Sequence, residues 1–560
     1  MNTFKKKSLH VAVIAGLAAI GAAGTAEAVH INPDGTGQVL VFPYYTARAG
    51  QATLITIINS QGNTKMVKVR FLEGKNSREV LDFNLFLSPA DVWTGAIVAT
   101  TNGARIISND NSCVTPSDLF AETRTDGLNP LNDFKNYQYT GAFADATPFA
   151  SLDRTREGYF EVIEMGVIDD NAIDGDPIVG ATAVAVTGFI KHNSAGVPAN
   201  CNALNSFDNF AGNPATTRFP NTIAGVVAVP AVLTQPPRGG LAGRASIINA
   251  TTGSQADGSN FTYSPTAFDA WSVSQQYTEA GNLGPSITSV DSGTVALIGP
   301  TSNVFTSAGI VTTVWDVTTP LASGRNAMSA TMMRNSIINE YILDSATSSQ
   351  TDWIVTFPTK RAYVTAVAAL PSAAVPPFTN NFPLAGTGAC DPYGAAVFNR
   401  EEQIPGSSVV SSNPSPLPPG VVVAGSQLCW EANVVPFQAA SLLGSTNSNA
   451  LVGSLQAFVT GATSIAASPN TTPSLRVPTA TQGPNGYMIM TFTGAGQALV
   501  AAAPSATTRT PLGGAPVAVA NASYQGLPVI GMALHNYQKF GVAARYGGVI
   551  PHNFTRNITP

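Results

Sequence analysis

Residues 66–72 read MVKVRFL and residues 80–87 read VLDFNLFL, and both stretches alternate apolar with polar side chains. Successive side chains of a strand point to opposite faces of its sheet, so the alternation predicts two strands that each bury one face. In the first strand, Lys68 and Arg70 are expected to face water. The side chains expected to point inward are Val67, Val69, Phe71, Leu81, Phe83, Leu85 and Leu87.

Similar short runs flank these two strands. QVLVFPYY (Gln38–Tyr45) and ATLITIIN (Ala52–Asn59) precede them, and a further strand from Asp91 to Ala99 is expected to form a hairpin with Ala104–Ser108. Pro43 cannot donate a ladder hydrogen bond, so the first run is expected to be an edge strand or to carry a bulge. About six short strands in about 80 residues favour an immunoglobulin-like sandwich.

Runs rich in β-branched residues and bounded by Gly, Pro, Asn and Ser recur along the chain, which predicts an all-β fold of tandem immunoglobulin-like β-sandwich domains. Residues 29–115 would form the first sandwich, 116–360 a central β domain, and 361–560 a C-terminal β domain with a Pro-rich loop. Within the central domain, Gly158–Met165 and Ala181–Lys191 are expected to pair as strands.

The N-terminus has the pattern of a secretory signal peptide over residues 1–28. Three lysines, Lys5 to Lys7, precede an apolar stretch from Leu9 to Ala23, and Ala26 and Ala28 supply the small residues of a cleavage site. The apolar stretch is shorter than the ~20 residues that a membrane span needs. We therefore expect export through the inner membrane of a bacterium and a mature chain without a transmembrane span. The mature chain would be secreted or lie on the cell surface, and retention in the periplasm stays open.

All four cysteines lie in the exported part, where an oxidising compartment favours disulfides. Three pairings are possible. Cys113–Cys201 with Cys390–Cys429 is preferred because it closes the shortest loops. A zinc site is disfavoured because the sequence has no C-x-x-C spacing.

Composition argues against two classes of protein. A net charge of −5 and a pI of about 5.6 exclude a strongly basic nucleic-acid binder. Hydrophobic residues make up 44% of the chain, which argues against disorder over its whole length.

Catalytic patterns are sparse. The sequence contains neither G-x-S-x-G nor H-E-x-x-H. Glu161 and Glu164 are three residues apart and would point to opposite faces of one strand, so they cannot both flank one glycosidic bond. One of them is expected to lie on a partly covered face and to pair with Arg or Lys, and no catalytic residue is assigned.

The best candidate for an ion site is the acidic stretch from residue 169 to residue 176. Its oxygen ligands could gather Ca²⁺, although the spacing departs from the EF-hand pattern. The alternative is a solvated acidic loop, and no other cofactor is expected. The candidate metal ligands are Asp169, Asp170, Asn171, Asp174 and Asp176.

Several longer strings resemble a group of secreted or cell-surface proteobacterial proteins with β-rich modules. They include GQVLVFPYYT (Gly37–Thr46), NLFLSPADVWTG (Asn84–Gly95), GYFEVIEMG (Gly158–Gly166) and DWIVTFPTKR (Asp352–Arg361). The resemblance implies export and β-rich modules, and it carries over no catalytic or binding residue.

Together these patterns favour a non-catalytic structural or interaction protein of the bacterial envelope or cell surface. Low charge density opposes self-assembly only weakly, so a neighbouring copy is one possible partner. A secreted protein that binds glycans or another ligand is the alternative. A secreted hydrolase with a dispersed site is the third interpretation.

Overall fold

The computed structural model describes the chain in segments that together carry its sheets. These are residues 28–121, 130–141, 150–168, 186–207, 234–250, 260–274, 276–290, 299–316, 318, 320–364, 374–382, 388–400, 427–438, 440–448, 485–538 and 545–559. The residues of the expected signal peptide before Ala28 lie outside this description.

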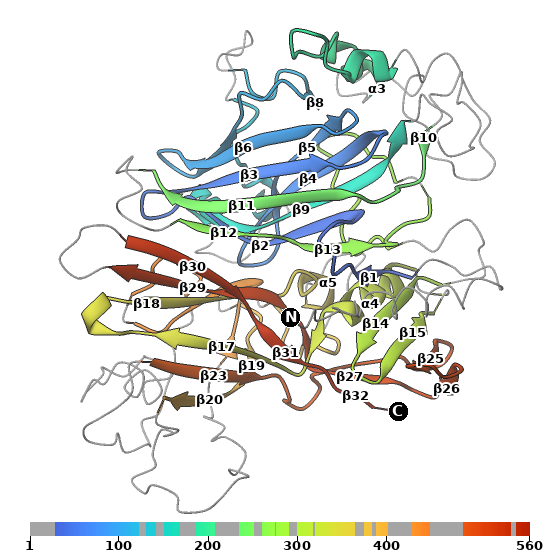
Figure 1. Cartoon of the computed structure of the whole chain (residues 1–560), viewed down its shortest axis with the longest axis vertical. Helices are drawn as coiled ribbons and strands as arrows, with labels where there is room; N and C mark the ends of the chain where they lie inside the picture. The colour runs from blue at the N-terminus through green and yellow to red at the C-terminus, as the bar shows by residue number, and fades with distance from the viewer. Residues whose placement is uncertain are drawn as a thin grey trace, which may run out of the picture.

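Two antiparallel sheets form a sandwich in the upper half of the molecule (Figure 1). Within the described residues, one sheet has five strands in the order β12 (Phe261–Tyr263), β11 (Leu241–Asn249), β3 (Gln51–Asn59), β6 (Val92–Ala99) and β7 (Ala104–Ile107). The other has eight, in the order β1 (His30–Ile31), β13 (Thr266–Asp269), β2 (Val39–Thr46), β9 (Glu157–Ile168), β4 (Thr64–Glu73), β5 (Glu79–Leu87) and β8 (Cys113–Thr115), with β10 (Thr234–Gln235) beside β9.

The alternation read from the sequence places the core between these sheets. Val67, Val69 and Phe71 of β4 are buried, as expected, and pack with Trp93 of β6 in one hydrophobic cluster. Each strand can present one apolar face because its residues alternate between faces. The bulge expected near Pro43 is confirmed, because the register of β2 against β9 shifts between Phe42 and Tyr45.

Two sequence expectations about this sandwich are wrong. Lys68 and Arg70 do not face water; they are buried on the other face of the eight-stranded sheet, because residues 277–287 cover that face. Residues 186–190 of the second expected strand are helical, and the partners of β9 in the described chain are β2, β4 and β10; residues 181–185 lie outside the described residues. The expected hairpin of β6 with β7 is confirmed.

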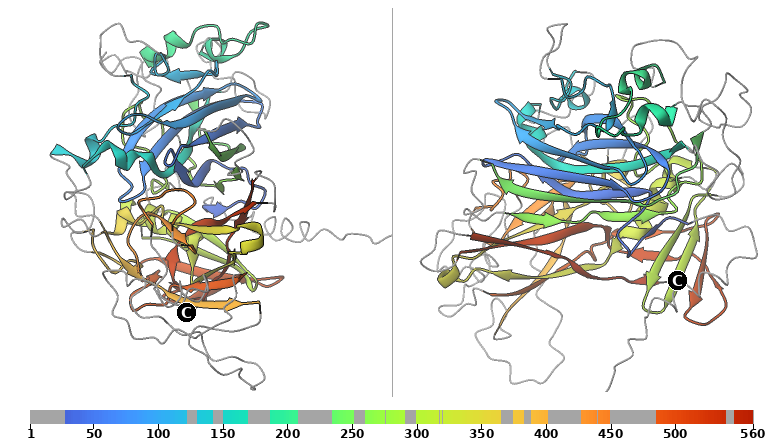
Figure 2. Two further views of the ribbon diagram at one scale, coloured as in Figure 1. Left: turned by 90° about the vertical axis from the view of Figure 1, so that its left-hand side faces the viewer. Right: turned by 45° about the horizontal axis from the view of Figure 1, so that its top comes forward.

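The lower half contains further antiparallel sheets (Figure 2). In the described chain, one consists of β22 (Ala432–Pro436), β18 (Gln350–Thr356), β29 (Ile530–Gln538) and β30 (Arg545–Pro551). A second consists of β20 (Gly394–Asn399), β23 (Asn485–Thr491), β17 (Ser336–Ile342) and β31 (Asn553–Thr555). A third consists of β14 (Thr301–Thr306), β15 (Gly309–Val314), β25 (Ala506–Pro511) and β26 (Val517–Val519).

Small sheets and short helices complete the described fold. The small sheets are β16 (Met333–Arg334) with β28 (Leu527–Pro528), β19 (Asp391–Pro392) with β21 (Gln427–Leu428), and β24 (Ala498–Val500) with β27 (Ser523–Gln525) and β32 (Ile558–Thr559). Besides the helical residues 186–190, the helices are α3 (Leu204–Phe207), α4 (Pro320–Met332) and α5 (Arg361–Val364), and the 3₁₀ turns are η1 (Tyr137–Tyr139), η3 (Leu152–Arg156), η4 (Cys201–Ala203) and η6 (Ser345–Thr347).

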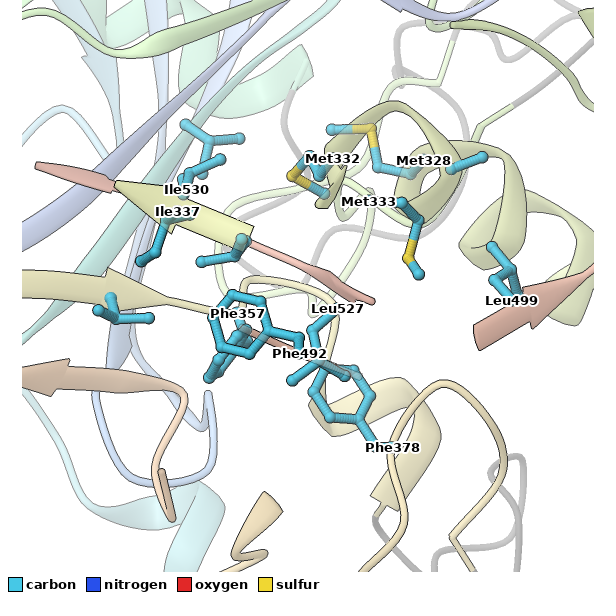
Figure 3. Packing of buried hydrophobic residues seen from close by; sticks show 14 of the residues in the cluster. Met328, Met332, Met333, Ile337, Phe357, Phe378, Phe492, Leu499, Leu527 and Ile530 are labelled. Atoms are coloured by element: carbon cyan, nitrogen blue, oxygen red, sulfur yellow. The ribbon is translucent and has the colours of Figure 1, made fainter. Parts of the chain in front are cut away.

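Strand β18 joins the upper and lower halves because its two faces belong to different cores. Ile354 packs into the cluster of the upper sandwich, whereas Trp353 and Val355 pack into the cluster of the lower half. Figure 3 shows part of the lower core, where Met332 and Met333 lie near Leu527 and the aromatic rings of the same cluster.

The protein is therefore all-β in the described residues, with several antiparallel sheets and few helices. Strands on both sides of residue 115 share the eight-stranded sheet. The three-domain division and the immunoglobulin-like assignment stay predictions.

Candidate functional site

The turn between β4 and β5 carries four charged side chains, yet all of residues 73–79 are buried. Glu73 accepts hydrogen bonds from the Arg154 guanidinium at 2.5 and 2.7 Å and from the backbone N–H groups of Lys75, Asn76 and Arg78. Burial by itself raises the pKa of Glu73, but Arg154 and these N–H donors hold it below its usual value.

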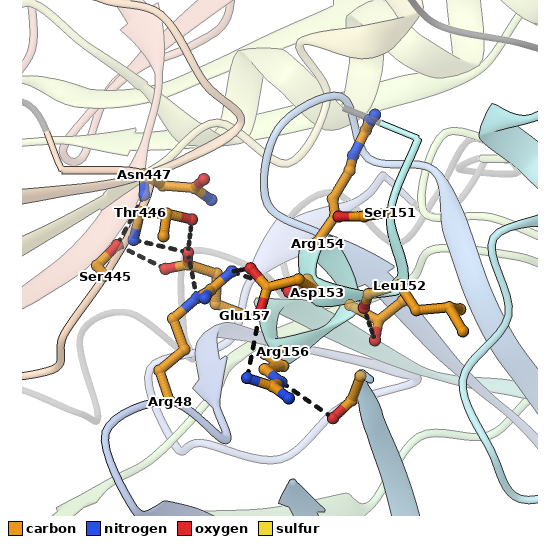
Figure 4. Close-up of polar contacts among 12 residues, drawn as sticks. Arg48, Ser151, Leu152, Asp153, Arg154, Arg156, Glu157, Ser445, Thr446 and Asn447 are labelled. Atoms are coloured by element: carbon orange, nitrogen blue, oxygen red, sulfur yellow. Dashed lines mark hydrogen bonds and ion pairs between the residues drawn. The ribbon is translucent and has the colours of Figure 1, made fainter. Parts of the chain in front are cut away.

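A second buried carboxylate, Glu157 at the start of β9, lies next to this turn (Figure 4). Its oxygens accept hydrogen bonds from Arg48 Nε at 2.7 Å, Ser445 Oγ at 2.5 Å and Thr446 Oγ1 at 2.6 Å. Burial opposes ionisation, and Arg48 together with the two hydroxyls lowers the pKa of Glu157 below its usual value. Glu157 thus binds residues 445–446 to the upper sandwich.

Lys75 extends this charged contact between the halves. Its Nζ donates to Asn447 Oδ1 at 2.8 Å and lies 4.1 Å from the centre of the Trp430 ring. Burial lowers the pKa of Lys75 to about 8, although Glu157 and Glu73 attract the charged form. The contact combines an amide acceptor with a cation–π interaction.

A further set of ion pairs lies under residues 277–287. It is on the face of the eight-stranded sheet that carries Lys68 and Arg70, which were expected to face solvent. Arg70 bridges Glu79 at 2.6 Å and Glu161 at 2.7 Å, and Lys68 pairs with Asp82 at 2.9 Å. Burial raises the pKa of Glu79 to about 7 despite the attraction of Arg70. The charges of these buried side chains are therefore compensated by one another and not by hydration.

Glu161 and Glu164 are arranged as the sequence predicted. Glu161 lies on the face of β9 that carries Arg70, whereas Glu164 points to the opposite face and pairs with Lys65 at 2.6 Å. Each glutamate therefore has a cationic partner.

Glu431 is a buried carboxyl with weaker compensation. Burial raises its pKa to about 8, although Lys360 and a hydrogen bond from Ser77 favour the charged form. Within the described residues, Glu431 Oε2 has no hydrogen-bond partner. Glu431 precedes β22 and faces the same charged turn, so the junction holds at least one group that titrates near neutral pH.

A pocket of about 260 Å³ opens beside the start of β5. Glu79 and Asp82 lie at its acidic side, Leu119 and Leu131 are part of its apolar wall, and Tyr137 at its edge is 69% exposed. An apolar wall with a few polar groups and an exposed ring is the usual lining of a small-molecule site.

The structure contains both disulfides of the preferred pairing, Cys113–Cys201 and Cys390–Cys429.

The calcium candidates Asp169, Asp170, Asn171, Asp174 and Asp176 lie outside the described residues. Among described side chains, no three His, Cys, Asp or Glu gather in a way that could hold a metal ion.

Sequence reasoning missed the charged junction of Arg48, Glu73, Arg154 and Glu157. A signal for it exists, because only 11% of the chain is charged while the turn EGKNSRE (residues 73–79) contains four charges in seven residues. In a chain so poor in charge, a dense charged turn marks a place where ionic contacts are concentrated.

None of the helices in the described part of the chain has the length and apolar character that crossing a membrane requires. Comparison with protein families, curated proteins and solved structures finds no match.

Proposed function

We propose that the protein is an exported, non-catalytic structural or interaction protein of the bacterial envelope or cell surface. The observation that carries the proposal is the outer face of the five-stranded sheet. The partner that we propose for this face is a second copy of the chain. The two disulfides are compatible with export to an oxidising compartment.

The outer face has a row of apolar side chains at its centre. The strand register places Leu54 of β3 beside Ala96 of β6, and Ala96 beside Ile107 of β7. Leu54 is 41% exposed and Ile107 is 43% exposed. Neighbouring exposed apolar side chains on a sheet offer a surface that a partner can cover.

Charge supports a second copy as the occupant. Leu54, Ala96 and Ile107 carry no charge, so two such rows can meet without like charges between them, while the exposed Arg244 of β11 lies on the same face beside the row. Behind the row, Ile55 and Trp93 are buried in the sandwich core, so the face is supported by packed side chains and needs little ordering on association.

The test is the mass of the exported chain in solution, measured by light scattering and sedimentation over a range of concentrations. The wild-type chain is expected to self-associate, and Leu54→Lys is expected to weaken association at least about tenfold by placing a charge in the interface. Leu512→Lys is the matched control, because Leu512 is 77% exposed and follows β25 in another sheet. A wild-type chain that stays monomeric at all concentrations would contradict the assignment of a second copy.

The location is tested separately, by fractionation of the native cells and protease treatment of intact cells. Digestion of the protein in intact cells is expected for surface display. Complete protection would instead place the chain in the periplasm.

The pocket beside β5 favours binding of a small ligand or glycan as the second candidate function. An exposed Tyr137 ring can stack on a sugar face while Glu79 and Asp82 accept hydrogen bonds from its hydroxyls. A glycan array with the wild-type chain tests this function, with Tyr137→Ala expected to abolish retention. Tyr487→Ala, on the 42% exposed ring of β23, is expected to leave retention unchanged.

A further inference from the structure

Two arginines meet at the C-terminal end of α4. Arg334 belongs to β16, directly after the helix, and Arg556 follows β31 near the other end of the chain. Arg334 Nη1 and Arg556 Nη2 both donate to the carbonyl oxygen of Thr331, at 3.0 and 2.7 Å. Since both nitrogens contact one oxygen, the two guanidinium groups are direct neighbours.

Within the described residues, no carboxylate balances their positive charges. Among the described residues, neither Arg334 nor Arg556 has an acidic partner, and Arg556 Nε is buried without a hydrogen-bond acceptor. Arg334 is only 5% exposed. Burial and the neighbouring Arg556 lower the pKa of Arg334 well below its usual value, and burial lowers the pKa of Arg556 to about 10.

The helix end compensates only part of this charge. Arg334 also donates to Met333 O and Arg556 Nη1 donates to Phe305 O at 2.8 Å, whereas Thr331 O is a carbonyl that the end of α4 leaves without an intrahelical partner. The C-terminal end of a helix corresponds to about half a negative charge. Two guanidinium groups carry two positive charges, and most of their charge therefore remains uncompensated.

The ring of Phe554 packs against both guanidinium groups and is itself partly exposed to solvent. Its ring centre is 3.8 Å from the Arg334 guanidinium carbon and 4.9 Å from that of Arg556. The Phe554 side chain is 46% exposed. The ring packs against both planar groups, and Arg556 is partly exposed, so solvent reaches the pair on the Arg556 side.

We propose that Arg334 and Arg556 form a binding site for an oxyanion, with Phe554 at its edge. The ligand is a phosphate group or a carboxylate, since both match the planar donor pattern of guanidinium groups. This site is independent of the sheet face and of the pocket beside β5, because it lies in the lower half at the junction of α4, β16 and β31.

The experiment measures calorimetric binding and thermal unfolding of the full exported chain with inorganic phosphate and with acetate. Saturable binding of either anion, with a raised unfolding midpoint, is expected. Tighter binding of phosphate identifies a phosphate-type ligand, and tighter binding of acetate identifies a carboxylate. Absence of saturable binding by both anions would overturn the proposal.

Variants separate binding from a purely structural role at the helix end. Arg556→Gln is expected to reduce affinity at least about tenfold, and Arg556→Lys, which keeps the charge but loses the planar donor pattern, is expected to fall between it and the wild type. Arg509→Gln is the matched control because Arg509 also donates to a backbone carbonyl of the C-terminal tail, at Ile558. If Arg556→Gln folds and binds either anion as the wild type does, the site is wrongly assigned.

Discussion

Lys65 Nζ and Glu164 Oε1 are 2.6 Å apart, and neither side chain is exposed to solvent. Glu164 also accepts hydrogen bonds from the backbone N–H groups of Arg238 and Gly239. The pair therefore connects β4 and β9 to the segment that leads into β11. Both charges were removed from water on folding, so each depends on the other for compensation.

Removing one member of this pair is expected to destabilise the fold strongly. Lys65→Met leaves Glu164 buried without its cation and should cost about 3–5 kcal/mol in the free energy of unfolding. The double variant Lys65→Met with Glu164→Gln should recover part of that loss, because Gln keeps an acceptor for the two N–H groups. Urea unfolding followed by fluorescence measures both. Arg244→Met, on an exposed side chain of β11, is the control and should change stability by less than about 0.5 kcal/mol. Equal stability of Lys65→Met and the wild type would contradict the buried pair.

Glu431 should make the protein less stable as the pH rises. Its pKa is raised from 4.5 to about 8 in the folded state, so between these values the folded chain holds a proton that the unfolded chain has released. Stability attributable to Glu431 is therefore present below pH 4.5 and is lost as the pH rises toward 8, by up to about 1.4 kcal/mol per pH unit. Glu431→Gln should flatten this decline in urea titrations between pH 5 and 8. Glu340→Gln, on a side chain 47% exposed, should keep the wild-type slope. Parallel slopes for Glu431→Gln and the wild type would argue against the assignment.

The contact of Glu157 with residues 445–446 predicts that two variants lose different amounts of stability. Ser445→Ala removes one hydrogen bond to a charged group and should cost about 1.5–3 kcal/mol. Glu157→Gln also leaves Arg48 with only its partner Asp153, so it should cost more than Ser445→Ala. Chemical denaturation at constant pH ranks the two variants. The reverse order would show that Arg48 does not depend on Glu157.

The disulfide from Cys113 to Cys201 should stabilise the covering segment rather than the sandwich core. It attaches η4 to β8 across 88 residues of sequence, and Cys113 is buried in a small cluster with Met66 and Ile190. Replacing both cysteines with alanine should cost about 2–5 kcal/mol. Hydrogen exchange should then speed up in residues 186–207 before it does so in β3 and β4. Uniform acceleration across the sandwich would contradict this order.

Local alternation predicted much of the upper sandwich and failed where distant segments cover a strand. Val67 and Phe71 face the core as their spacing requires, and Glu161 and Glu164 point to opposite faces because strand geometry is local. The burial of Lys68 was not predictable in this way, since its cover comes from Glu279, more than 200 residues later.

The charged junction was missed for the same reason. The turn at residues 73–79 is made an interior contact by segments distant in sequence, because Arg154 binds Glu73 and Asn447 binds Lys75. Strand pairing between distant segments, such as β2 with β13, likewise leaves no local signal. The pair Arg334 and Arg556 is also brought together only by the fold, because 222 positions of sequence numbering separate them.

Strand β18 couples the unfolding of the two halves of the molecule. Trp353 and Ile354 are neighbours in sequence, yet each is anchored in a different half of the protein. Removing β18 would expose both hydrophobic cores to water at the same time, so neither half can unfold while the other stays intact. A protease that attacks one end would therefore cut few sites until the whole structure unfolds.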